Sequence, residues 1–178
     1  MAIDIFYADD DPFLAELADD FLAGENLNHL SMVAGAPPPN FNPSETLQAV
    51  PATELLKVIK KVRPKIILLD FDMGAITGLE ILKTLHAENP DQFITREEIL
   101  AGAKLEQGKL LSVILSADIN GSQAELQEAL NQGSLVFLLS KRLHMHEAWL
   151  ELKALAVDEG SAETIEEFHQ KACKALKV

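Results

Sequence analysis

Hydrophobic residues in this chain gather in short runs, and four of these runs stop at a polar or charged residue. The four runs cover residues 3–8, 65–69, 112–115 and 135–140. Short runs rich in branched aliphatic side chains predict buried β-strands, and residues 30–34 predict a further strand. The intervening segments predict helices over residues 12–23, 53–61 and 79–87. Strands that alternate with helices indicate an α/β fold.

The residues that follow the four runs have side chains suited to chemistry. Asp9 and Asp10 follow the first run, Asp70 the second, Ser116 the third and Lys141 the fourth. In open parallel sheets, ligands bind beyond the carboxyl ends of the strands, so we expect these side chains to meet at one site. Paired acids, a single acid, a hydroxyl and an amine are the groups that phosphoryl transfer uses.

In this order, the set resembles the receiver domain of two-component response regulators over most of residues 2–157. Gly78, eight positions after Asp70, falls where that family has a glycine. The resemblance implies a flavodoxin-like, doubly wound sheet of five parallel strands in the order 2-1-3-4-5, with helices on both faces.

The resemblance also implies a phosphoacceptor and a metal site. Asp70 looks like the phosphoacceptor, and Asp9 and Asp10 look like the acidic pair that holds Mg²⁺. Asp10 and Asp70 would be direct ligands, Asp9 would act through water, and the backbone carbonyl of Asp72 would complete the set. Mg²⁺ prefers oxygen ligands and keeps several waters, so a few carboxylates suit it.

Further residues take roles from the same resemblance. Ser116 looks like the switch hydroxyl, and Lys141 looks like the invariant lysine that balances the charge of the acids and the phosphate. Asp72 and Asp118 lie two positions after Asp70 and Ser116, where the family tunes the lifetime of the phosphoryl group.

Each of these residues also has a purely structural interpretation. Asp11 and Pro12 form a good helix start, so the three acids at residues 9–11 could serve capping alone. Asp72 could be an ordinary turn residue, and Ser116 a helix cap. We favour the functional interpretation because four independent strand ends carry the expected residues in the family's order.

The chain departs from the family pattern at three places. Gly74 stands where receivers usually have proline soon after the acceptor. Arg142 follows Lys141, where the family usually has a proline with a cis peptide bond. Phe137 lies four positions before Lys141 instead of three, and Leu138 occupies the expected aromatic position. These differences put the usual coupling between serine and aromatic residue in doubt, although they leave the phosphorylation chemistry in place.

We expect a receiver domain over residues 1–157 with insertions at about 35–50 and 89–109, and a C-terminal helical extension over 158–178. In the first insertion, residues 35–43 contain three consecutive prolines and Phe41, so we expect an exposed loop with no regular element over these residues. In the second insertion, the capping box that begins at Thr95 predicts an added helix, stopped by Gly108.

The extension shows a second capping box, which begins at Thr164. Ile165, Phe168, Ala172 and Leu176 form a narrow apolar stripe, which either packs on the body or joins a partner.

Charge and composition exclude several classes of partner. A net charge of −13 argues against nucleic-acid binding. No apolar run approaches the roughly 20 residues that span a bilayer, and no signal pattern opens the chain, so we expect a cytoplasmic protein.

The single cysteine, Cys173, cannot form an internal disulfide. The remaining expected partners are a histidine kinase or histidine phosphotransfer protein and an unknown output protein, with a homodimer left open.

Two other functions remain open. An Asp-x-Asp pattern at Asp70 and Asp72 also looks like haloacid-dehalogenase-type phosphatases, but that family places its second acidic pair after the lysine. The other alternative is a receiver-like interaction module that is never phosphorylated. We rank the phosphoacceptor first, so we expect a signalling domain and not an enzyme.

Overall fold

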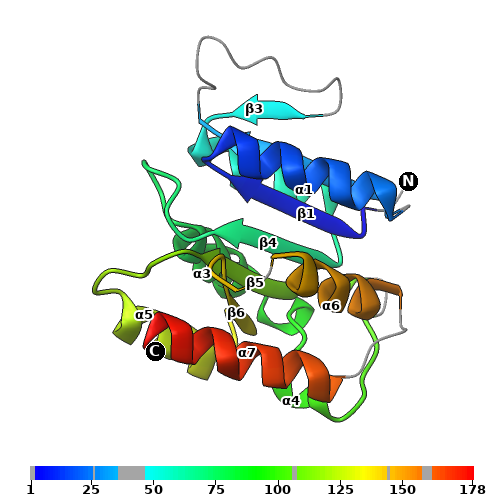
Figure 1. The fold of residues 1–178 in the computed structure, drawn as a ribbon, viewed down its shortest axis with the longest axis vertical. Helices are drawn as coiled ribbons and strands as arrows, with labels where there is room; N and C mark the ends of the chain where they lie inside the picture. Colours follow the sequence, from blue (N-terminus) through cyan, green and yellow to red (C-terminus); the bar gives the residue numbers. More distant parts are fainter. Residues whose placement is uncertain (1–2, 26, 36–46, 106–107, 144, 158–161) are drawn as a thin grey trace.

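One parallel sheet of six strands forms the centre of the molecule (Figure 1). The computed structural model describes residues 3–25, 27–35, 47–105, 108–143, 145–157 and 162–178. In sequence order the strands are β1 Ile5–Asp9, β2 His29–Ala34, β3 Gln48–Val50, β4 Ile66–Asp70, β5 Leu111–Ser116 and β6 Phe137–Ser140. In the sheet they follow the order β3-β2-β1-β4-β5-β6, and every neighbouring pair is parallel.

Helices connect the strands and cover both faces of the sheet. They are α1 Pro12–Gly24, α2 Leu55–Val62, α3 Gly78–Glu88, α4 Arg96–Leu100, α5 Gln123–Gln132, α6 Met145–Val157 and α7 Ala162–Leu176, with short 3₁₀ helices η1 Ala52–Glu54 and η2 Pro90–Gln92. Within the described part of the chain, no helix combines the length and the hydrophobicity that crossing a membrane requires.

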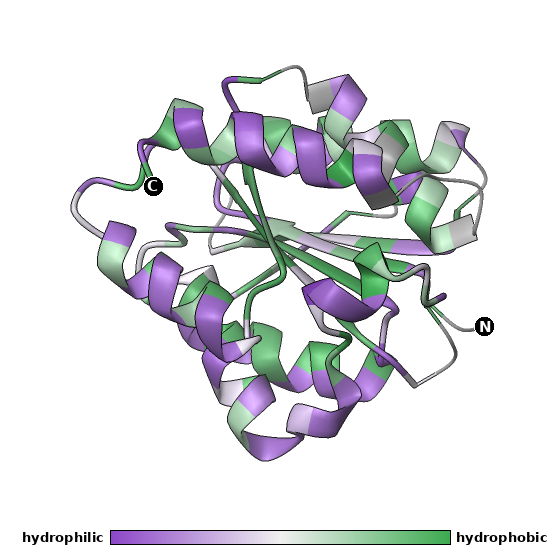
Figure 2. Cartoon of the chain, turned by 90° about the horizontal axis from the view of Figure 1, so that it is seen from below, coloured by the Kyte–Doolittle hydropathy of each residue, from purple (hydrophilic) through white to green (hydrophobic). Residues whose placement is uncertain are grey.

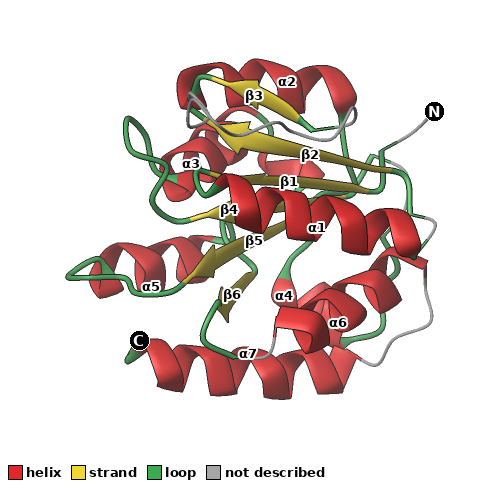
Figure 3. Cartoon of the chain, turned by 45° about the horizontal axis from the view of Figure 1, so that its top comes forward, coloured by secondary structure: helices red, strands yellow, loops and turns green. Residues whose placement is uncertain are grey.

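Alternating side chains divide the core into two layers. Ile66 and Leu68 of β4 pack with α1 and α6, whereas Ile67 and Leu69 pack with α2, α3 and α5. Such alternation follows from the two-residue period of a strand, and both faces are apolar because both are covered. Figure 3 shows α1 and α6 in front of the sheet, and Figure 2 shows helices on both sides of it. The flavodoxin-like α/β fold is thereby confirmed.

The sheet has one strand more than the resemblance implies. Without β3 the order is the expected 2-1-3-4-5, and β3 adds an edge beside β2. Its three residues are exposed or half-buried, so the sequence contains no hydrophobic run that predicts this strand. The strand lies in the first predicted insertion, of which residues 36–46, including Phe41, are outside the described residues.

The two added helices follow the predictions only in part. Thr95 and Glu98 form the predicted capping box at the start of α4, but the helix ends at Leu100, well before Gly108. The capping box at Thr164 is wrong, because α7 begins at Ala162 and Thr164 lies inside the helix.

The C-terminal helix α7 covers the free edge of β6 (Figures 1 and 3). Ile165, Ala172 and Leu176 of the predicted stripe are buried, so the stripe packs on the body of the molecule. The imidazole Nδ1 of His169 accepts a hydrogen bond of 3.0 Å from the backbone N–H of Leu138 in β6. An open strand edge is prone to pairing with other chains, and this helix closes it.

Candidate functional site

The carboxyl ends of four neighbouring strands bring the predicted residues together. Asp9 ends β1, Asp70 ends β4, Ser116 ends β5, and Lys141 directly follows β6. The register pairs the last residues of β4 and β5, and those of β5 and β6, almost level with one another. Asp10 follows Asp9 at the start of the loop, so all five residues lie at one edge of the sheet.

Lys141 bridges two of the acids. Its Nζ lies 2.7 Å from Oδ2 of Asp9 and 2.9 Å from Oδ1 of Asp70. The Lys141 backbone N–H donates to the carbonyl of Ser116 at 2.7 Å, which anchors the residue beside β5. Burial lowers the pKa of Lys141, but the charges of Asp9 and Asp70 outweigh burial and raise the pKa above its usual value. The ammonium is therefore a fixed positive charge between the two carboxylates.

The three acids form a cluster that suits a hard divalent cation. Asp9, Asp10 and Asp70 each offer one carboxylate oxygen, and the three oxygens lie within 4.8 Å of one another. Burial, followed by the charge of Asp9, raises the pKa of Asp70 to about 7 against the pull of Lys141. Burial and the same neighbour also raise the pKa of Asp10. So much negative charge at one edge, all of it on oxygen, fits the ligand preference of Mg²⁺.

Tyr7 also belongs to the site, although it is not among the residues predicted from the sequence. Its hydroxyl donates to Oδ2 of Asp9 at 2.6 Å, and both residues are fully buried. The backbone N–H of Asp11 donates to Oδ1 of Asp9 at 3.0 Å. With Lys141, three donors therefore hold the Asp9 carboxylate. The two-residue period of β1 places Tyr7 on the same face as Asp9, and that period was the available signal.

The opposite side of the site contains Ser116, Asp118 and Arg142. The Ser116 hydroxyl donates to the backbone carbonyl of Asp118 at 3.0 Å. Asp118 Oδ2 lies 3.6 Å from Arg142 Nη2, and both side chains are exposed. Arg142 thus stands beside one of the two predicted lifetime residues, and no cis peptide bond occurs in the described part of the chain.

The loop after Asp70 is held by short-range contacts. Oδ1 of Asp72 accepts the backbone N–H of Gly74 at 3.0 Å, as expected of a turn residue. Gly78 approaches the end of β4 so closely that a Cβ there would lie 2.3 Å from the backbone oxygen of Asp70. Glycine is therefore required at this position for the end of β4, with Asp70, to keep its place.

The altered register of β6 persists in the structure. Phe137 and Leu138 are both fully buried but belong to opposite layers of the core. Phe137 packs against His169 of α7, with ring centroids 5.5 Å apart. An aliphatic side chain thus occupies the family's aromatic position, and the nearby aromatic ring faces α7.

Comparison with known proteins gives structural neighbours only. No family model and no curated protein sequence matches the chain. A response regulator receiver domain protein from Methanospirillum hungatei JF-1 has 16% identity and a TM-score of 0.58, covering 89% of this chain and 97% of its own. The receiver domain of Francisella response regulator 1452 has 18% identity and a TM-score of 0.52, covering 88% and 98%.

A third neighbour, named adenylate cyclase from Rhodopirellula baltica, has 18% identity and a TM-score of 0.56, and covers 96% of this chain and 98% of its own. Structural similarity at these low sequence identities establishes the fold and not the function, because proteins with unrelated functions share folds of this kind. The chain has the fold of a response regulator receiver domain.

Proposed function

We propose that the chain is a phosphorelay receiver that accepts a phosphoryl group on Asp70 in a Mg²⁺-dependent reaction. One observation carries the proposal: Lys141 contacts Asp9 and Asp70 at once, beside a three-carboxylate cluster at the carboxyl ends of the strands. This arrangement supplies a nucleophile, a fixed positive charge and a cation site within one small region.

The proposed reaction is an in-line displacement. A carboxylate oxygen of Asp70 forms a bond to phosphorus, the bond from phosphorus to the donor's histidine nitrogen breaks, and that nitrogen keeps the electron pair. In the proposed reaction Lys141 stabilises the oxygens of the phosphoryl group, and the Ser116 hydroxyl does so once it turns from the Asp118 carbonyl. Asp10, Asp70 and the Asp72 carbonyl would hold Mg²⁺, with Asp9 acting through water, and the cation would neutralise further negative charge.

The partners follow from the same proposal. The donor is a histidine kinase or a histidine phosphotransfer protein in the cytoplasm. The output is contact with another protein, because the net charge of −13 opposes binding to nucleic acid. The named receiver neighbours support a signalling role and not that of a dedicated enzyme.

Intact mass spectrometry after incubation with acetyl phosphate and Mg²⁺ tests the proposal. We expect a gain of one phosphoryl group that disappears in Asp70→Asn and falls sharply in Lys141→Ala. Asp20→Asn, an exposed carboxylate on α1, is the matched control and should gain the phosphoryl group normally. Rapid repeated hydrolysis of small phosphate esters, lost in Asp72→Asn, would establish the phosphatase alternative. A chain that neither gains mass nor hydrolyses esters would be an unphosphorylated module.

We also propose that Asp72 and Asp118 set the phosphoryl lifetime by governing the access of water to Asp70. The side chains of both residues are exposed at the site. Asp72→Asn and Asp118→Ala should each change the dephosphorylation rate severalfold, measured as the decay of the phosphorylated mass. Decay at the wild-type rate in both variants would remove these residues from that role.

A further inference from the structure

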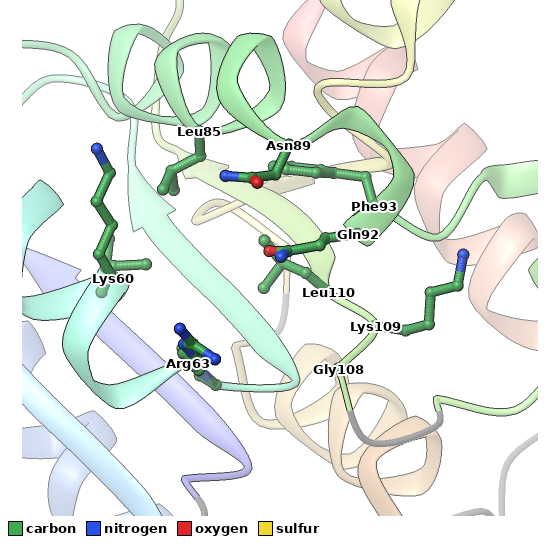
Figure 4. A pocket seen from close by; sticks show the side chains of 11 residues that line it. Lys60, Arg63, Leu85, Asn89, Gln92, Phe93, Gly108, Lys109 and Leu110 are labelled. Atoms are coloured by element: carbon green, nitrogen blue, oxygen red, sulfur yellow. The ribbon is translucent and has the colours of Figure 1, made fainter.

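A pocket lies at the amino-terminal end of the sheet, at the opposite ends of the strands from Asp70 (Figure 4). It has a volume of about 310 Å³. The C-terminal end of α2 forms one wall, the end of α3 forms a second, and the segments that flank the inserted helix α4 form the third. The proposed phosphoryl chemistry uses none of its residues, so the pocket requires its own explanation.

The floor of the pocket is apolar. Ile59, Leu85, Phe93 and Leu110 line it, and all four side chains are at least nine-tenths buried. The backbone N–H of Leu110 donates to the carbonyl of Gln92 at 2.7 Å, which ties the two ends of the insertion together. A buried apolar floor of this kind favours contact with the hydrophobic or aromatic part of a ligand.

The rim of the pocket is polar and carries three cations. Figure 4 shows the amides of Asn89 and Gln92 in the middle, between Lys60 and Arg63 on one side and Lys109 on the other. Lys60 shares its charge with Glu88 at 2.6 Å, and the Lys109 ammonium donates to a backbone carbonyl. Primary amides offer a donor and an acceptor side by side, which suits the edge of a heterocyclic ring.

Arg63 adds an independent observation. It ends α2 in the left-handed conformation, with φ 49° and ψ 62°, where glycine is the favoured residue. A side chain at this position lowers stability relative to glycine, because Cβ crowds the backbone. Among the described residues, the structure shows no carboxylate paired with its guanidinium. The Arg63 side chain lines the pocket, so its guanidinium is available there to an anionic ligand.

We infer that this pocket binds a small molecule with a flat ring system and one phosphate group, the chemistry of a nucleoside monophosphate. The ring lies on the apolar floor with its edge at the amides of Asn89 and Gln92. The guanidinium of Arg63 binds the phosphate through two parallel hydrogen bonds, a geometry that arginine provides and lysine does not. Lys60 is paired with Glu88, but Arg63 and Lys109 leave positive charge at the rim, and this charge favours an anionic ligand.

Isothermal titration of the full chain with AMP, GMP, CMP and UMP tests the inference. At least one of the four should bind, and adenosine or inorganic phosphate alone should bind at least about tenfold more weakly than the best nucleotide. Arg63→Gly should weaken binding by at least about tenfold. The same variant should melt at a higher temperature than the wild type, so its lost affinity cannot be attributed to unfolding.

Two controls separate this pocket from the Asp70 site. Lys57→Ala removes a cation from an exposed position on α2 outside the pocket, and it should leave nucleotide affinity unchanged. Asp70→Asn should also bind normally, so failure of the phosphorelay proposal and failure of this one are distinguishable. No binding of any of the four nucleotides, or equal binding by Arg63→Gly, would overturn the inference.

Discussion

At the scale of single residues, the Tyr7 hydroxyl has a role that can be measured. It is one of three donors to the buried Asp9 carboxylate. We expect Tyr7→Phe to lower the free energy of unfolding of the metal-free protein by about 1.5–3 kcal/mol, because a hydrogen bond to a charged group is lost. Urea unfolding measures this change.

Ser112→Ala is the matched control for Tyr7→Phe. The Ser112 hydroxyl is buried and has no hydrogen-bond partner in the described structure. Its removal should leave stability unchanged or raise it, because an unsatisfied buried polar group is costly. A Tyr7→Phe variant as stable as the wild type would show that the hydroxyl does not hold Asp9.

The raised pKa of Asp70 predicts a pH dependence. In the folded protein the carboxyl group has a pKa of about 7, compared with an ordinary value of 3.8 for an exposed aspartate. Between these values the folded state binds the proton more tightly than the unfolded state, so stability falls as the pH rises. Urea unfolding of the metal-free protein between pH 3.8 and 7 should show this decrease in the free energy of unfolding. In Asp70→Asn the part of the decrease that the Asp70 carboxyl contributes should be absent. An identical slope in both proteins would contradict the raised pKa.

At the scale of elements, α7 depends on a neutral histidine. Burial, with the nearby charge of Arg96, lowers the pKa of His169 from 6.5 to about 4. Unfolding lets this residue bind a proton below pH 6.5, so its contribution to stability is complete above that value. The contribution is lost progressively as the pH falls toward 4. The sign is opposite to that for Asp70, although the two windows overlap.

His169→Gln tests the dependence of α7. Glutamine can still accept a hydrogen bond from the Leu138 N–H, but it does not titrate. The free energy of unfolding of the variant should therefore decline less between pH 6.5 and 4 than that of the wild type. His146→Gln, at an exposed position on α6, should behave like the wild type. Equal declines in all three proteins would contradict a neutral, buried His169.

The elements that were predictable from the sequence are those with strong local signals. The strands β1, β4, β5 and β6 are continuous apolar runs, and the capping box at Thr95 fixes the start of α4. The short strand β3 lacks such a signal, because its three residues are not a buried apolar run. Its hydrogen-bonded pairing with β2 holds it in the sheet. Acidic residues after Thr164 resembled a helix start, but α7 already begins at Ala162, and contacts with β6 hold it in place.

At the scale of the whole molecule, the acid cluster should make stability depend on Mg²⁺. A cation that binds only the folded state stabilises it by about 2.7 kcal/mol at a hundredfold excess over its Kd. We expect calorimetric melting at a higher temperature with Mg²⁺, and a much smaller shift in Asp10→Ala. An equal shift in this variant would exclude the cluster as the binding site.

Residues at strand ends made much of the candidate site predictable. Parallel strands bring their carboxyl ends to one edge, so Asp9, Asp70, Ser116 and Lys141 could be placed together from sequence alone. Tyr7 was missed because a buried tyrosine in a strand resembles any core aromatic residue. The pocket at the amino-terminal end of the sheet could not be predicted because its walls come from three segments distant in sequence, and only the folded chain brings them together.

The contact between Tyr7 and Trp149 gives the molecule a built-in optical reporter. These are the chain's only tyrosine and only tryptophan, and their ring centroids lie 5.2 Å apart in an edge-to-face arrangement. Excitation energy absorbed by Tyr7 is transferred to Trp149 at this distance, and the Tyr7 hydroxyl donates a hydrogen bond to Asp9. The fluorescence of the unlabelled protein therefore comes mainly from Trp149, whose ring packs against the tyrosine that holds Asp9.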